Sequence, residues 1–340
     1  MPEPALLATG KRGGAPELTV RGHLVVVDAE GSVLAAAGDP DSLTTLRSCV
    51  KPLQALPFVR LAMERLGAGN AELAVACASH SGEPVHVEAV RRLLALGGVA
   101  EEHLACGAHL PFDDRAARQV ILEGGPRRIH NNCSGKHAAM LVTCAVMGWP
   151  LEGYRAADHP CQLAVTEAMS TAMRVDLRAQ PWGVDGCGLP TYGLALREIA
   201  AGFARAQPDP SFGRCRAAMA ARPDLVAGTG RFDTALLASA GGSVTAKTGG
   251  AAVWAASLPG GWGMAIKLEA GASEALPAVA LGALVHLGAV AVDDQLATFV
   301  EPELHNWEGT VVGRIRAEPS ALEPLEVLRA SVPRSATISL

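Results

Sequence analysis

A serine and a lysine stand three residues apart in the stretch RSCVKPLQAL, and a proline follows the lysine directly. Proline fits the first turn of a helix, so we expect Ser48 at a helix N-terminus with Lys51 within reach of its hydroxyl. Burial and the positive end of the helix dipole both lower a lysine pKa. A lysine that is neutral at working pH can take the serine proton and make the serine a nucleophile for acyl transfer. The alternative is a serine N-cap followed by an exposed lysine.

Lysine is scarce in this chain. Only five of the 29 lysines and arginines are lysines: Lys11, Lys51, Lys136, Lys247 and Lys267. A buried ammonium can lose its proton, whereas a guanidinium effectively cannot. We therefore expect lysine where a removable proton is needed, and all but Lys11 lie in stretches that suit such a role. Lys267, amid the apolar residues of GMAIKLE, is a candidate second amine base; the alternative is an edge or snorkelling residue.

A second motif supports the serine–lysine reading. AKTGG places Lys247 and Thr248 on an expected strand late in the chain. An early S-x-x-K with a late K-T-G is the pattern of serine β-lactamases and penicillin-binding proteins. In that fold the late motif lies beside the nucleophile and binds a substrate carboxylate. The S-D-N motif that stands between the two is not evident in this chain.

A cluster of metal-ligand types lies in two further stretches. HNNCSGKHAAM places Cys133, Lys136 and His137 within one turn, and VDGCGLP supplies Asp185 and Cys187. Thiol, imidazole, carboxylate and amine groups suit zinc, although the spacing matches no standard finger. One alternative is a pair of reduced core cysteines beside a turn. Another makes Cys133 a nucleophile with His137 as its base.

Composition excludes several classes of protein. A hydrophobic fraction of 49% and a charged fraction of 19% indicate a globular chain with a sizeable core. The net charge of -5 argues against a nucleic-acid binder. The N-terminus lacks a secretory h-region, and the eight cysteines include no CxxC pair, which predicts free thiols in the cytoplasm. The longest apolar run, 276–292, is shorter than the ~20 residues that span a bilayer and predicts a packed helix.

Hydrophobic periodicity places these motifs on elements. A β-hairpin is predicted on either side of a turn at 29–31, and further strands at 241–258 and 261–269. Helices are predicted over 52–66, 85–97, 130–149, 159–175 and 191–206, whereas 71–83 reads as a short buried strand and a polar turn. The predicted fold class is therefore α/β or α+β. We expect a single domain with two lobes: a sheet from about 15–40 and 240–315, and a helical region over about 52–235.

The chain resembles the thermolabile, type-II-like L-asparaginases of the rhizobial type. The stretches that carry the resemblance are VVVDAEG, GDPDSLTTLRSCVKPLQALP, ACASHSGEPVHV, HNNCSGKHAAML, VDGCGLPTYGLAL, GTGRFDT, AKTGG, GWGMAIKLEAG and HNWEGTVVG, in family order over nearly the whole chain. The resemblance implies a fold similar to serine β-lactamases and glutaminases. It also implies hydrolysis of L-asparagine to L-aspartate and ammonia by a homodimer.

The resemblance further implies roles for individual residues. Two serine–lysine tandems fall on Ser48 with Lys51 and on Ser79 with Lys267, although ASHSGE also offers Ser81 for the second serine. A Zn²⁺ ion held by cysteine, lysine, cysteine and water maps onto Cys133, Lys136 and Cys187, with Asp185 adjacent.

A zwitterionic substrate needs a positively charged group for its carboxylate and a negatively charged group for its ammonium. The candidate substrate-binding residues are Arg47, His80, Glu83, Asp185, Arg231, Lys247 and Thr248. Arg47 and Arg231 are expected to meet the carboxylate, and Glu83 or Asp185 the ammonium. Two departures bear on the pocket: the family's E-S-x-H-R-G reads ELTVRG at 17–22, and a frequent cysteine is replaced by Ala255 or Ala256.

Two other functions fit the same residues. The first is an L-glutaminase or a broader amide hydrolase. The second, from another class, is a catalytically silent regulatory protein that binds zinc or an amino acid. Retention of both serine–lysine pairs argues against the silent protein, because a pure binder has no need for a deprotonatable amine.

Overall fold

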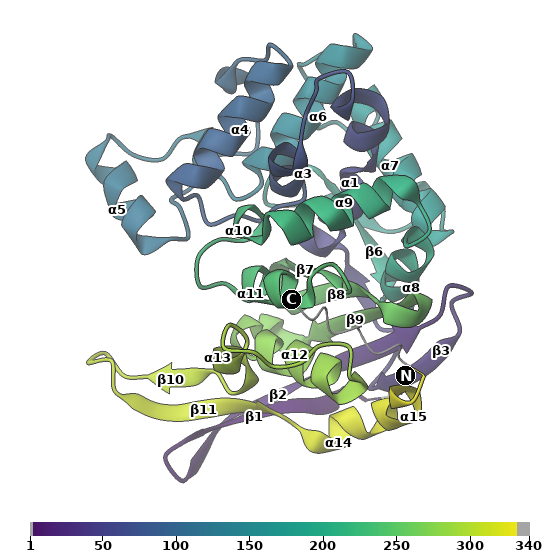
Figure 1. The fold of residues 1–340 in the computed structure, drawn as a ribbon, viewed down its shortest axis with the longest axis vertical. Helices are drawn as coiled ribbons and strands as arrows, with labels where there is room; N and C mark the ends of the chain where they lie inside the picture. The colour runs from purple at the N-terminus through teal and green to yellow at the C-terminus, as the bar shows by residue number, and fades with distance from the viewer. Residues whose placement is uncertain (1–2, 332–340) are drawn as a thin grey trace, which may run out of the picture. The chain divides into compact units, whose positions relative to one another are not determined.

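The computed structural model describes residues 3–331, and these fall into two compact units (Figure 1). Of the described residues, unit 1 contains 3–49, 194–205 and 239–331, and unit 2 contains 50–193 and 206–238. Each unit is therefore built from segments that are distant in the sequence.

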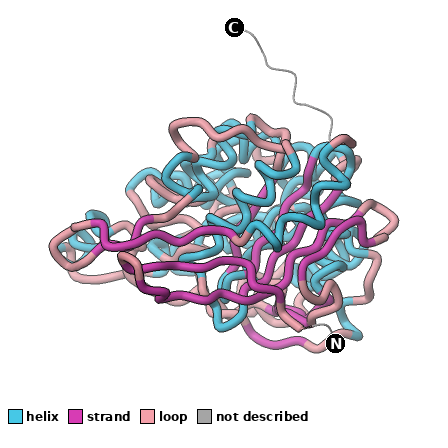
Figure 2. The backbone as a smooth tube through the Cα atoms, turned by 90° about the horizontal axis from the view of Figure 1, so that it is seen from below, coloured by secondary structure: helices cyan, strands magenta, loops and turns pink. Residues whose placement is uncertain are grey.

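An eight-stranded sheet forms the body of unit 1, in the order β10-β11-β1-β2-β9-β8-β7 with β3 paired to β2. Figure 2 draws the strands in magenta. Its strands are β1 Ala5–Arg12, β2 Ala15–Val27, β3 Val33–Ala37, β7 Thr245–Gly249, β8 Val253–Leu258, β9 Trp262–Leu268, β10 Glu303–His305 and β11 Val311–Ala317. All of its strand pairs are antiparallel. The early strands β1 and β2 thus lie between two groups of late strands, β10–β11 and β9–β8–β7.

The central strand β2 belongs to the early part of the chain and pairs with β9 from its late part. Its residues 22–27 are all buried, and they pair with β9 from Gly22 opposite Leu268 to Val27 opposite Gly263. Burial on both faces explains why this strand reads as a continuous apolar run rather than an alternating one. At Gly263 a side chain would collide with the Ala200 carbonyl, so this glycine lets helix α8 approach β9 closely.

Helices and one short strand complete unit 1. They are β4 Leu43–Thr45, α8 Leu196–Ala206, α12 Leu276–Leu287, α13 Ala297–Val300, α14 Pro319–Leu322 and α15 Glu326–Arg329. Helix α12 packs against β1 and β11. It is the packed helix that the apolar run at 276–292 predicts, and no described helix is long and apolar enough to cross a membrane.

Unit 2 consists mainly of helices. They are α1 Lys51–Gln54, α2 Leu56–Phe58, α3 Asn70–Ala76, α4 Pro84–Leu96, α5 Asp114–Leu122, α6 Ser134–Met147, α7 Pro160–Met173, α9 Pro210–Ala221, α10 Pro223–Val226 and α11 Phe232–Ala240. Strands β5 Trp182–Val184 and β6 Pro190–Ala195 form a hairpin. Helix α6 packs against α3 and α4, and at Gly135 a side chain would collide with the Val75 carbonyl.

The prediction of a mixed α/β fold is confirmed, as are the early hairpin, the late strands and the helices over 85–97, 130–149 and 159–175. The strand predicted within 71–83 is wrong, because residues 70–76 form helix α3. Its apolar run is too short for periodicity to distinguish a strand from a helix. The Glu72 carboxylate accepts the Gly69 N–H at 2.9 Å, and this N-terminal bond together with the alanines favours the helix.

A second prediction is wrong near residue 191. Residues 190–195 form strand β6, and the helix begins only at Leu196. The DGCGLP stretch, predicted as a loop, lies at the turn of the β5–β6 hairpin, where Gly188 has a φ of 83°. The residues on either side of it pair as antiparallel strands, from Trp182 opposite Tyr192 to Val184 opposite Pro190.

Candidate active site

Lys51 lies at the centre of a cluster in unit 2 that we call the amine–thiol cluster: Lys51, Ser79, Cys133, Lys136 and Cys187. Pro52 is in the first turn of α1, as predicted, and the side chain of Lys51 is fully buried. Its Nζ donates to Ser79 Oγ at 3.0 Å, to Cys133 Sγ at 3.2 Å and to the Ala78 carbonyl. The structure therefore holds an amine against both a hydroxyl and a sulfur.

The turn that carries Ser79 is fixed by its backbone. Ser79 N donates to the Val226 carbonyl at 3.0 Å, and Arg231 Nη1 donates to the Ser79 carbonyl at 3.0 Å. The Arg231 guanidinium also lies 5.9 Å from the centre of the Phe112 ring. Arg231, predicted to meet a substrate carboxylate, thus holds the backbone of the predicted second serine.

Glu83 and His80 also hold this turn. The Glu83 carboxylate accepts Thr229 N at 2.9 Å and Thr229 Oγ1 at 2.7 Å. His80 accepts the Gly82 N–H on Nδ1 at 3.2 Å, and its Nε2 lies 3.0 Å from Ser134 Oγ. Burial lowers the pKa of His80 well below its usual range, so the ring is neutral. Both residues were predicted to bind substrate, and both have structural partners within unit 2.

The two cysteines of the predicted metal site lie together at the start of α6 and in the β5–β6 turn. A hydrogen bond from Cys187 lowers the pKa of the Cys133 thiol well below its usual range, aided by the charges of Lys51 and Lys136 and opposed by burial. The same hydrogen bond and burial raise the pKa of Cys187. Of the two thiols, Cys133 is therefore the one whose pKa is lowered.

Lys136 completes the predicted metal-ligand set. Its Nζ lies 3.5 Å from Cys187 Sγ. Burial lowers the pKa of this lysine, but the charges of Cys187, Cys133 and Asp185 outweigh burial and raise it. Within 3–331, no group of three or more histidine, cysteine or carboxylate side chains could hold a metal ion. The predicted set contains only two such residues, and its third donor is an amine.

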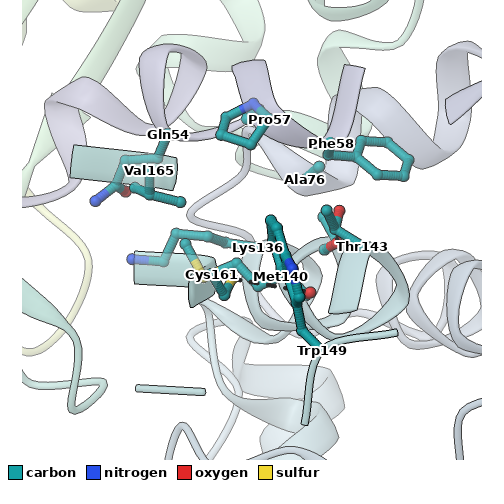
Figure 3. Close-up of a pocket in the computed structure, with 12 residues that line it drawn as sticks. Gln54, Pro57, Phe58, Ala76, Lys136, Met140, Thr143, Trp149, Cys161 and Val165 are labelled. Carbon is teal, nitrogen blue, oxygen red and sulfur yellow. Dashed lines mark hydrogen bonds between the residues drawn. The ribbon is translucent and has the colours of Figure 1, made fainter. Parts of the chain in front are cut away.

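The stem of Lys136 borders a small cavity in unit 2, together with Gln54, Met140, Trp149 and Cys161 (Figure 3). Its volume is about 10 Å³. A cavity needs roughly 10–15 Å³ to hold one water molecule. It is therefore far too small for an amino acid and is part of the packing around α6.

Unit 1 contains the second group of predicted residues, which we call the serine-turn cluster: Arg47, Ser48, Lys247, Thr248 and Lys267. Ser48 is buried in a 3-10 helix, Arg47–Val50. The end of β7 packs against this turn, because a Cβ on Gly249 would lie 3.3 Å from Ser48 N. The Arg47 guanidinium lies against Gly250. The K-T-G motif is therefore beside the predicted nucleophile, as its pattern predicts.

Both lysines of the serine-turn cluster donate to backbone carbonyls. Lys247 is fully buried, and its Nζ donates to the Thr248 carbonyl at 2.8 Å. Lys267 donates to the Leu268 carbonyl at 2.9 Å and to the Ala251 carbonyl. Burial lowers the pKa of Lys267; the charge of Glu269 opposes this and that of Arg47 adds to it. The direction agrees with an amine that can be neutral.

Backbone strain gathers around this cluster. Of the five described non-glycine residues with positive φ, four lie in unit 1: Arg47, Ala251, Ala252 and Ala270, with φ between 46° and 58°. Each costs about 1–2 kcal/mol, and such strain is typical of functional sites. The strained Ala251 supplies the carbonyl that Lys267 contacts. No sequence pattern predicts these positions, because alanine is not a residue that favours positive φ.

The predicted serine–lysine tandems cross the boundary between the units. Ser48 is in unit 1 and Lys51 in unit 2, three residues apart along the chain, and Ser79 and Lys267 are also in different units. Both tandems stay predictions. Within unit 2, the structure instead pairs Lys51 with Ser79, a contact that spacing along the sequence does not indicate.

The comparisons with known proteins bear on the whole chain. A search of the curated proteins returned no match. The model of the L-asparaginase II family matches residues 8–317, a range that includes both clusters. This match covers well over half of the 340 residues, and the chain therefore belongs to the L-asparaginase II family.

Proposed function

We propose that the protein hydrolyses L-asparagine to L-aspartate and ammonia by serine–lysine catalysis. Membership of the L-asparaginase II family supports the substrate and the reaction. The observation that carries the mechanism is the fully buried Lys51, whose Nζ lies 3.0 Å from the hydroxyl of Ser79. A buried amine in contact with a hydroxyl can exchange a proton with it, which is the requirement for serine activation.

In the proposed reaction, Ser48 Oγ attacks the side-chain amide carbonyl and gives its proton to Lys51. The C–N bond then breaks, and Lys51 returns the proton to the leaving ammonia. Water hydrolyses the aspartyl ester, which releases L-aspartate and restores the hydroxyl of Ser48. Ser79, hydrogen-bonded to Lys51, relays the proton, and Lys267 polarises the attacking hydroxyl with its positive charge.

Ser79 is a second candidate nucleophile, because its hydroxyl is the one in direct contact with Lys51. The two candidates are separated by trapping the ester. A diazoketone analogue of asparagine, or rapid acid quench with L-asparagine, labels the nucleophile for peptide mass spectrometry. We expect the label on the peptide with Ser48, its loss in Ser48→Ala and its retention in Ser79→Ala. A label on Ser79 would reverse the assignment, and an unmodified, inactive protein would refute the proposed function.

A Zn²⁺ ion held by Cys133, Lys136 and Cys187 is a further part of the proposal. Zinc bonds of about 2.3 Å to sulfur and 2.0–2.1 Å to nitrogen place tetrahedral ligands about 3.6 Å apart. The 3.5 Å between Lys136 Nζ and Cys187 Sγ fits that spacing, and the contact of Cys187 with Cys133 adds the second sulfur. When bound, the ion would supply a Lewis acid that orients a substrate oxygen.

Metal content tests this part independently of activity. Elemental analysis of the parent is compared with Cys133→Ser/Cys187→Ser, with Cys144→Ser as a matched control for a buried cysteine outside the cluster. We expect about one zinc per chain in the parent and the control, and none in the double variant. Equal metal content in all three would remove the ion from the proposal.

Substrate choice is tested with side-by-side rates of ammonia release from L-asparagine and L-glutamine. Faster release from L-glutamine would favour the glutaminase reading. Binding of L-asparagine without ammonia release would favour the silent regulatory protein. The proposed homodimer is checked by light scattering on the purified chain.

A further inference from the structure

We propose that Arg155 binds the α-carboxylate of an amino-acid ligand, and Asp185 its α-ammonium, in a surface cavity of unit 2. The identification of this ligand as L-asparagine rests on the proposed function. Arg155 carries no sequence motif that the family resemblance singles out.

The cavity has a volume of about 280 Å³. It is lined by Ala105, Cys106, Gly107, Arg128, Arg155, Asp185, Gly186, Cys187 and Gly188. Pockets for drug-sized ligands measure about 300–1,000 Å³. This cavity lies just below that range and suits a ligand of the size of a single amino acid, unlike the 10 Å³ cavity behind Lys136.

Two cysteines connect the cavity with the amine–thiol cluster. Cys187 lines the cavity and contacts Lys136 and Cys133 on its other side. Cys106, also in the lining, is buried, and its Sγ donates to the Arg128 carbonyl at 3.3 Å. A ligand in this cavity therefore contacts Cys187, which in turn contacts Cys133, the thiol against which Lys51 lies.

The two arginines of the cavity have different roles. Arg128 Nη1 donates to the Glu102 carbonyl at 3.2 Å and to the Leu104 carbonyl at 2.8 Å, so it fixes the backbone. Arg155 makes no hydrogen bond or ion pair with another residue of the part of the chain that the structure describes. Its guanidinium lies across Gly188, where a Cβ would collide with it. Arg155 therefore offers its donors to the cavity.

A buried tyrosine fixes the backbone beside Arg155. Tyr154 is 2% exposed, and its hydroxyl accepts the Ala105 N–H at 3.0 Å and lies 2.6 Å from His137 Nδ1. The Tyr154 carbonyl accepts Gln162 Nε2 at 3.0 Å. These bonds join the segment to the cavity wall at Ala105 and to α6 and α7. The base of the Arg155 side chain is thereby held in place, which lowers the entropic cost of binding.

Asp185 faces the cavity from the β5–β6 turn. Its N–H donates to the Leu189 carbonyl at 2.8 Å, its carbonyl accepts the Gly188 N–H at 2.8 Å, and Oδ1 accepts the Gly186 N–H at 2.8 Å. The turn therefore sets the direction of the carboxylate. A simple anion beside Arg155 would be repelled by Asp185, whereas a zwitterionic α-amino acid offers the opposite charge to each.

The test is a calorimetric titration that combines protein and ligand variants in the Ser48→Ala background, which blocks turnover. The ligands are L-asparagine, 3-aminopropanamide, which lacks the α-carboxylate, and succinamate, which lacks the α-ammonium. We expect Arg155→Gln to weaken L-asparagine and succinamate about tenfold or more and to leave 3-aminopropanamide unchanged. Asp185→Asn should weaken L-asparagine and 3-aminopropanamide and spare succinamate.

Arg118→Gln, on the exposed face of α5, is the matched control and should leave all three affinities unchanged. Equal weakening of all three ligands in Arg155→Gln would show a structural role, and unchanged affinities would place the carboxylate elsewhere; either result overturns the proposal. So would tighter binding of inorganic phosphate than of L-asparagine. Ligand-selective binding in a parent that releases no ammonia would refute only the proposed function. Ammonia release with unaltered affinity in Arg155→Gln would refute only the carboxylate site.

Discussion

Both clusters bury lysines, but their ammonium groups contact different acceptors. In the serine-turn cluster, Lys247 and Lys267 donate to the carbonyls of the residues that follow them, at 2.8 Å and 2.9 Å. In the amine–thiol cluster, Lys51 contacts Ser79 Oγ at 3.0 Å and Lys136 contacts Cys187 Sγ at 3.5 Å. Lys267 thus contacts backbone carbonyls, whereas Lys51 and Lys136 also contact reactive side chains.

This difference indicates which lysines exchange protons. A carbonyl only accepts a hydrogen bond, so it fixes the position of a cation. A hydroxyl or thiol both accepts and donates, so the proton can return to the amine. We infer that Lys51 is the principal proton carrier and that Lys267 mainly places positive charge. The predictions below test this comparison.

The largest effect is expected at Lys51. Lys51→Arg keeps the charge but cannot give up a proton, so ammonia release should fall by about 10²–10⁴-fold. Lys267→Arg, the matched change in the other cluster, should lower ammonia release only about tenfold, because its charge remains. Ammonia release at saturating L-asparagine measures both.

Lys51 is fully buried, so the larger guanidinium could disturb the fold. Lys51→Met, which is close in shape, supplies a second variant, and circular dichroism with thermal melting checks that each variant is folded. A folded Lys51→Arg protein that keeps its activity would end the distinction between the two clusters. Equal losses at Lys51 and Lys267 would mean that both amines carry protons.

A substitution at Arg231 tests whether the position of Ser79 beside Lys51 matters for the rate of reaction. Arg231 donates to the Ser79 carbonyl, so Arg231→Gln should misplace the serine and lower kcat about tenfold while KM changes less than about twofold. The role predicted from the sequence, contact with the substrate carboxylate, would instead raise KM. Steady-state kinetics on L-asparagine separate the two, and a rise in KM at constant kcat would support contact of Arg231 with the substrate carboxylate instead.

The sequence predicted the elements better than the contacts. The hairpin at β2–β3 and helices α4, α6 and α7 follow from periodicity and turn residues, which act locally. Helix α3 was missed because seven largely apolar residues in a buried segment fit either period. The grouping of Cys133 with Cys187 is predicted from their donor types and from the family resemblance and not from spacing, since 54 residues separate the two along the chain.

Apart from the approach of the K-T-G motif to Ser48, contacts between distant segments could not be predicted from motifs. The bond from Lys51 to Ser79 depends on how α1 packs within unit 2, and the bond from Arg231 to Ser79 joins residues 152 apart. The substrate contacts that the sequence predicts for Glu83 and His80 stay predictions. The structure shows that Thr229 and Ser134 are their partners, which no one-dimensional pattern records.

A smaller effect, on stability, is expected from backbone strain at Ala251, whose carbonyl contacts Lys267 of the serine-turn cluster. Ala251 has a φ of 58°, so Ala251→Gly relieves about 1–2 kcal/mol of strain and adds about 0.5–1 kcal/mol of chain entropy to the unfolded state. We expect the free energy of unfolding to rise by about 0.5–1 kcal/mol in urea titrations. Ala164→Gly, in the middle of α7, is the control and should lose about 1 kcal/mol. Destabilisation of both variants alike would show that the backbone at Ala251 carries no strain.

The smallest expected effect is a pH dependence at Lys267. Burial holds the pKa of the Lys267 amine in the folded protein below the usual 10.5. At pH values between this lowered pKa and 10.5, the unfolded chain therefore binds a proton that the folded chain does not. Unfolding therefore takes up a proton in this window, and the free energy of unfolding gains a positive contribution as pH rises. Lys267→Met removes that contribution, so the parent should gain stability relative to the variant between pH 8 and about 10 in paired urea titrations. A constant difference across this range would mean that Lys267 keeps its proton throughout, as a fixed cation does, and would make the contrast with Lys51 sharper still.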